Sequence, residues 1–105
     1  MSAWTLLLAA GLLEIGWAVG LRYTEGFTRP LITLATVLAM AVSLFLLGLA
    51  LRQLPVGTAY AVWTGIGTAG TVLAGVLFLG EPVTVMRIAC VAMIVAGVTG
   101  LKTWG

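Results

Sequence analysis

The chain has 105 residues, which is enough for one domain of ordinary size. Hydrophobic residues make up 62 % and charged residues only 8 %, which excludes a soluble globular domain and indicates an integral membrane protein. The formal net charge is +2, but the five basic residues are spread singly along the chain, so we expect no nucleic-acid-binding patch.

Four long apolar runs are separated by short breaks that contain glycine, proline and charged residues. We expect them to form membrane-spanning helices over residues 4–21, 31–51, 56–79 and 83–101. The fold class predicted is therefore an all-α integral membrane protein, with one four-helix transmembrane domain over residues 1–105. Short connections make successive helices run antiparallel. Because no basic segment precedes the first run, we expect it to stay in the mature protein and not to be a cleaved signal peptide.

The first run, from Trp4 to Leu21, contains Glu14 as its only charge. As a helix it spans about 27 Å, and Glu14 lies about 2 Å along the axis from its middle. A carboxylate at that depth usually faces a bundle interior or a wet cavity. It serves there either as a binding site or as a polar group that only fixes a neighbouring helix.

Residues at helical spacing share a face with Glu14. They include Gly11, which would leave space beside the carboxylate, and Trp17. Trp17 offers an indole N–H donor and a π face for a cation, but it is equally suited to packing or to a membrane interface.

Polar and aromatic residues also occur in the second and third runs. Ser43 lies near the middle of the second run, where a serine more often bonds its own helix backbone than a ligand. In the third run, Tyr60 and Trp63 share a face with Gly67 and then with Gly70 or Thr71. Aromatic faces beside a carboxylate favour a cation site, with an aromatic belt and core packing as the alternative.

Two glycines, Gly65 and Gly67, bracket Ile66 in the third run and weaken the helix locally, which predicts either a hinge or a close helix contact. Small residues recur in the fourth run in the pattern that lets membrane helices approach closely, and this predicts dimer packing. They are Ala92, Ala96, Gly97 and Gly100.

The chain has no histidine and a single cysteine, Cys90, so we predict no metal site and no disulfide within the chain. No cofactor motif and no activated nucleophile are present either. An enzyme is therefore the least favoured class, and we expect no cofactor.

Lysine and arginine residues are almost evenly divided between the two sides of the membrane. Arg52 and Lys102 lie on the side of the termini, and Arg22, Arg29 and Arg87 lie on the other side. So small a bias permits insertion in both orientations. The chain has no internal inverted repeat, a feature from which many transporters build alternating access, but two oppositely oriented copies would supply it. We therefore predict an antiparallel, dual-topology homodimer with a Glu14 from each chain around a central cavity.

The sequence resembles the small multidrug resistance transporters over essentially its whole length. The likeness includes the central glutamate, GFTRP after the first helix, and LPVGTAYAVWTGIG at the opening of the third. Within the family, EIGWAVGLRYTEGF and GTAYAVWTGIG look like the guanidinium-exporter branch, as do Trp17 and Ser43. Arg22 stands where this branch often has lysine. Gly11 and Gly16 make the first helix less bulky, which could loosen selectivity toward substituted guanidinium compounds.

The resemblance implies an antiparallel homodimer in the bacterial inner membrane that exports guanidinium in exchange for protons. Glu14 of each chain would bind either protons or the cation, surrounded by a hydrogen-bond network of Trp17, Ser43, Tyr60 and Trp63. Gly65 and Gly67 would be the flexible point, and the fourth helix the main dimer contact. Two alternatives remain open: an exporter of quaternary ammonium and other lipophilic cations, and a membrane subunit that transports nothing and whose Glu14 fixes assembly.

Overall fold

The computed structural model describes residues 2–104 and contains four helices within that range. They are α1 (Ala3–Tyr23), α2 (Pro30–Ala50), α3 (Val56–Phe78) and α4 (Val85–Trp104). Each is long and apolar enough to cross a membrane, which confirms the predicted all-helical fold class with four spans.

The helices begin where local chemistry favours a first turn. The Ser2 hydroxyl accepts a hydrogen bond from the Thr5 N–H at the start of α1, and Pro30 opens α2 with its backbone angle already set for a helix. The largest difference from the expected starts is in α4, which begins at Val85 and not at residue 83. Here the Thr84 hydroxyl accepts a hydrogen bond from the Arg87 N–H at 3.1 Å, so Thr84 caps the helix.

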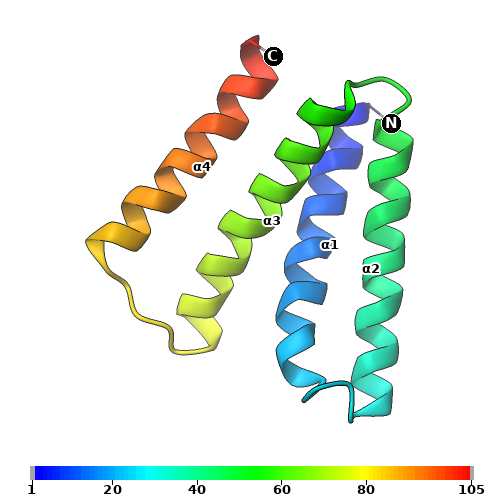
Figure 1. The fold of residues 1–105 in the computed structure, drawn as a ribbon, viewed down its shortest axis with the longest axis vertical. Coiled ribbons are helices and arrows are strands. Elements are labelled where there is room, and N and C mark those ends of the chain that lie inside the picture. Colours follow the sequence, from blue (N-terminus) through cyan, green and yellow to red (C-terminus); the bar gives the residue numbers. More distant parts are fainter. Residues whose placement is uncertain (1, 105) are drawn as a thin grey trace.

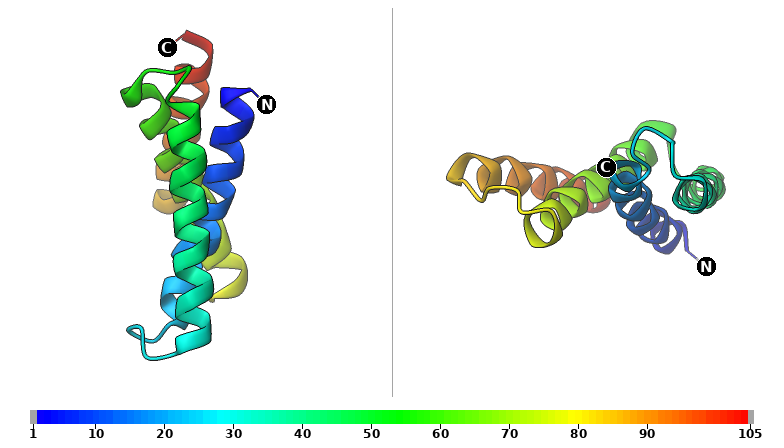
Figure 2. Two further views of the ribbon diagram at one scale, coloured as in Figure 1. Left: turned by 90° about the vertical axis from the view of Figure 1, so that its right-hand side faces the viewer. Right: turned by 90° about the horizontal axis from the view of Figure 1, so that it is seen from below.

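The four helices form a layer in which α1 lies between α2 and α3, while α4 packs along the far side of α3 (Figure 1). The described part of the chain measures 42 × 35 × 18 Å, and the view from below shows how thin the layer is (Figure 2). Both chain ends lie at one edge with the α2–α3 connection, as antiparallel helices require. No further helix of the described chain covers either face of the layer (Figure 2).

The buried core is centred on the first half of α1. Leu7 and Ala10 are fully buried there, in one hydrophobic cluster with Ala50 of α2 and Val62 of α3. By contrast, no residue of α4 in its described range is buried. The first three helices thus share one core, to which α4 is attached along a single side.

Glycines in α1 allow this helix to pack closely against its neighbours. A Cβ on Gly11 would lie 2.5 Å from Cγ2 of Ile66 in α3, and a Cβ on Gly20 would lie 2.6 Å from the Thr36 hydroxyl oxygen in α2. Small residues at such crossings drive helix packing in membranes through van der Waals contact. The position of α1 between α2 and α3 therefore depends on these glycines.

The contact at Gly11 gives a test of the fold. We expect Gly11→Val to lower the free energy of unfolding by about 1–3 kcal/mol, because the branched side chain would collide with the equally stiff Ile66. Thermal or denaturant unfolding in detergent measures this. Gly16→Val is the matched control, since nothing lies within 4 Å of a Cβ at Gly16. Equal losses in the two variants would contradict the packing account.

Candidate cation-binding site

A pocket of about 240 Å³ lies between α1 and α3. It is lined by Glu14, Trp17 and Ala18 of α1 and by Gly67, Thr68, Thr71 and Val72 of α3. The spacing explains the grouping, because residues three and four positions apart share one face of a helix. The only charged residue of the membrane spans outside their terminal turns thus lies in a pocket between two helices.

The side chain of Glu14 rests directly on Gly67. Its carboxyl group occupies the space that a Cβ at residue 67 would need, so only glycine admits it there. One carboxyl oxygen, Oε1, is buried without a hydrogen-bond partner in the described structure. Burying a carboxylate oxygen without a partner is costly, so this atom calls for a proton or a ligand that donates to it.

Two further polar atoms from the lining of this pocket are buried without partners. They are the indole nitrogen Nε1 of Trp17 and the hydroxyl oxygen of Thr71. The pocket therefore combines a carboxyl group, an N–H donor, an aromatic ring and the hydroxyls of Thr68 and Thr71, and the rest of its lining is apolar. Trp17 also packs against the core. It therefore both packs between helices and lines the pocket.

A second polar cluster joins three helices one turn away along α1. The Ser43 hydroxyl donates to the backbone carbonyl of Ala10 at 2.7 Å, and Trp63 Nε1 donates to the Ser43 oxygen at 3.0 Å. Ser43 thus bonds a neighbouring helix and not its own backbone. The ring of Tyr60 lies 5.5 Å from that of Trp63, centroid to centroid. Because Ala10 is four residues before Glu14, the cluster and the carboxylate are about 6 Å apart along the axis.

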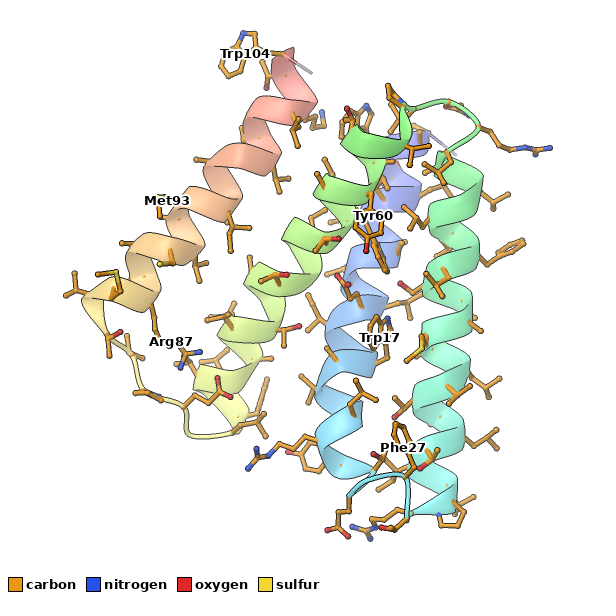
Figure 3. The ribbon with its side chains drawn as sticks, in the orientation of Figure 1. Trp17, Phe27, Tyr60, Arg87, Met93 and Trp104 are labelled. Atoms are coloured by element: carbon orange, nitrogen blue, oxygen red, sulfur yellow. The ribbon has the colours of Figure 1, made fainter. Side chains whose placement is uncertain are left out.

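The structure brings the predicted site residues together in two groups. Ser43, Tyr60 and Trp63 form one, and Glu14 and Trp17 form the other; among residues 2–104 no hydrogen bond connects Glu14 to the first group. Tyr60 and Trp17 project from α3 and α1 in Figure 3. Tyr60 is 56 % exposed, whereas Trp63 and Ser43 are buried.

The glycines that were predicted to line the site or to bend α3 lie at close contacts between helices. Gly11 faces Ile66 and is not among the residues that line the pocket. Gly65 contacts Val98 of α4, while α3 runs without a break through Gly65 and Gly67. Both glycines thus provide close packing here, and a hinge at this point stays a prediction.

Two features of the site were not predicted. The first is the contact of the Glu14 carboxyl group with Gly67, and the second is that Thr71 lines the pocket. The sequence signal for both was the four-residue spacing between Gly67 and Thr71, which puts them on one face of α3. It could not indicate that this face meets Glu14.

The small residues of α4 that were predicted to pack in a dimer mostly face away from α3. Ala92, Ala96 and Gly97 are exposed, and Gly100 is partly buried near the ring of Trp104. The residues of α4 that approach α3 are instead on another face, such as Val91, Ile94 and Val98. The surface suited to close helix contact is therefore available to another molecule.

Comparison with known proteins places this architecture in a family. The profile described as Small Multidrug Resistance protein matches residues 2–94, nearly the whole chain. The chain belongs to the small multidrug resistance family. Curated relatives named "Guanidinium exporter" are 56 % identical in Escherichia coli, 54 % in Citrobacter freundii and 52 % in Yersinia pseudotuberculosis. Each alignment covers 100 residues, 95 % of this chain and 95 % or 96 % of the relative.

Membership of the small multidrug resistance family confirms the predicted family and a multi-pass membrane setting. The names of the family and of the relatives are those of transporters and not of enzymes. We therefore ask how the pocket between α1 and α3 would bind a transported ion.

The second polar cluster gives a test by a double-mutant cycle. We expect Ser43→Ala and Trp63→Phe each to lower the free energy of unfolding, with a coupling of about 0.5–1.5 kcal/mol, because the two residues share one buried hydrogen bond. Unfolding of the two single variants and the double variant in detergent measures the coupling. Pairing Trp63→Phe with Thr99→Val is the control, since the Thr99 hydroxyl bonds Val95 of its own helix. Strict additivity for Ser43 and Trp63 would contradict the shared bond.

Proposed function

We propose that this protein exports guanidinium and small substituted guanidinium cations across the bacterial inner membrane in exchange for protons. The observation that carries the proposal is the unpartnered carboxyl oxygen of Glu14, held on Gly67 in a pocket between two membrane helices. The names of relatives that cover nearly the whole chain support the choice of cation.

The chemistry of the pocket suits a planar cation with N–H groups. Two parallel N–H donors match the two oxygens of a carboxylate, a geometry that a spherical ammonium ion does not reproduce. The Trp17 ring in the lining offers its π face to the positive charge. Its indole N–H can donate to a carboxylate oxygen. Glu14 is then the group that binds, and Trp17 the group that orients.

Coupling to protons follows from the use of one group for two ligands. Glu14 carries either a proton or the cation, so each displaces the other. When such a site opens to one side at a time, and the empty deprotonated form rarely changes sides, competition becomes exchange. The Ser43 and Trp63 cluster, one turn away, would join the network around the bound cation when the helices move.

A second copy in the opposite orientation would complete the transport site. The chain alone is a layer only 18 Å thick in its shortest dimension. The Glu14 pocket lies between α1 and α3, and the small residues Ala92, Ala96 and Gly97 of α4 are exposed. An antiparallel partner would close the pocket around two Glu14 side chains and supply the inverted symmetry that the single chain lacks. The nearly even distribution of lysine and arginine supports both orientations.

The main test is proton-coupled current in proteoliposomes on addition of guanidinium. We expect a current from the wild type and at least a hundredfold loss in Glu14→Gln, which corresponds to about 3 kcal/mol, because the amide can carry neither the charge nor the exchanged proton. Glu25→Gln is the matched control, since Glu25 is exposed in the α1–α2 connection, and it should transport like the wild type.

Other outcomes would favour the alternatives. Unimpaired coupled transport by Glu14→Gln would end the proposed mechanism. A current with a tetraalkylammonium ion but not with guanidinium would identify an exporter of quaternary ammonium compounds. A stable oligomer that gives no current with either cation would indicate an assembly subunit.

Competition for Glu14 also predicts how binding depends on pH. Lowering the pH should weaken guanidinium binding, because a protonated carboxyl must release its proton to accept the cation. Where Glu14 is mostly protonated, the apparent Kd should rise about tenfold for each unit by which the pH is lowered, for each proton displaced. Titration calorimetry in detergent over a series of pH values measures the slope, and a Kd independent of pH would contradict competition.

A further inference from the structure

We infer that Thr71 is a specificity-determining residue of the Glu14 pocket. In this account its hydroxyl oxygen accepts an N–H from the edge of the cation that Glu14 does not hold. The inference rests on the proposed function and extends it, because it specifies which guanidinium cations the pocket prefers. Thr71 and Glu14 would then hold one cation from two sides.

The hydroxyl of Thr71 lacks the bond that a threonine in a helix usually makes. Such a hydroxyl commonly donates to the backbone carbonyl four residues earlier. Thr99 of α4 does so, to Val95 at 2.9 Å. The buried hydroxyls of Thr33 and Thr64 also lack a partner among the described residues, but of these three unpartnered threonines only Thr71 lines the pocket of Glu14. The Thr71 oxygen is buried and has no partner among the described residues, although the Gly67 carbonyl is in the corresponding place. A buried hydroxyl without a partner is costly, so Thr71 is suited to a partner from outside the chain.

The position of Thr71 fits a cation that already contacts Glu14. Thr71 follows Gly67 by four residues, which is about 6 Å along α3. Gly67 is where the carboxyl group of Glu14 rests, and all three residues line the same pocket. N–H groups reach acceptors about 2.9 Å away, so a small ion between these two residues, with donors on opposite edges, would donate to both.

This arrangement selects among cations by where their N–H groups lie. Guanidinium and singly substituted guanidinium ions keep donors on edges that Glu14 does not use. N,N,N′,N′-tetramethylguanidinium has donors on one nitrogen only, so once this nitrogen faces Glu14 the opposite edge of the ion carries no donor. A quaternary ammonium ion has none. Thr71 therefore favours sparingly substituted guanidinium ions over heavily alkylated ones.

The experiment measures the Kd of guanidinium and of tetramethylguanidinium for Thr71→Val by titration calorimetry in detergent. Valine has the shape of threonine without the acceptor. We expect the Kd of guanidinium to rise about tenfold and that of tetramethylguanidinium to stay within about twofold. Thr71→Ser keeps the hydroxyl and should restore guanidinium binding. Thr99→Val is the control, since its hydroxyl is bonded within α4 and lies outside this pocket.

The possible results distinguish an error about Thr71 from an error about the proposed function. An unchanged Kd of guanidinium in Thr71→Val, an equal loss for both cations, or a loss that Thr71→Ser does not restore would overturn the function of Thr71 while leaving guanidinium binding intact. Failure of the wild type to bind guanidinium would overturn the proposed function as well. If Thr71→Val does not elute as a uniform species, Thr71→Ala removes the same acceptor with better helix propensity, and the same comparison applies.

Discussion

The close approach of α1 to α3 is the constraint on which the rest of this molecule depends. Gly11 admits Ile66 and Gly67 admits the carboxyl group of Glu14, so one helix pair provides both the packing contact and the pocket. A lipid environment offers no hydrophobic force to pull helices together, so backbone proximity has to come from small residues. Because the same crossing places the carboxyl group of Glu14 on Gly67, a change that loosens the packing also alters the binding pocket.

The helices could be predicted from the sequence because bilayer thickness fixes their length. Proline and glycine mark the breaks, and α2 and α3 begin and end within one residue of the expected positions. The helices α1 and α4 end two and three residues later than expected, at Tyr23 and Trp104, and α4 begins later because Thr84 caps it after Pro82. The order of helices in the layer could not be predicted in the same way. All four are apolar on most sides, so periodicity does not reveal that α1 lies in the centre or that α4 contacts α3 along one face.

The candidate site was predictable to the level of helix faces. A lone carboxylate in an apolar span identifies Glu14, and helical spacing groups it with Trp17. Which face of α3 meets that carboxylate depends on the rotation of one helix against the other, which spacing within a single helix does not contain. For that reason the sequence predicted either a hinge or a close helix contact at Gly67 without indicating its partner, and the contact with Glu14 became visible only in three dimensions. The bond of Ser43 to Ala10, 33 residues away, likewise has no local signal.

The weak attachment of α4 has a consequence for how this protein is handled. A helix without a buried residue in its own chain leaves most of its surface to other molecules, and in the proposed dimer its order would depend on mass action. Diluting such a dimer in lipid or detergent would weaken α4 before the three helices that share the core. Measured stability would then depend on the protein-to-lipid ratio as well as on the sequence.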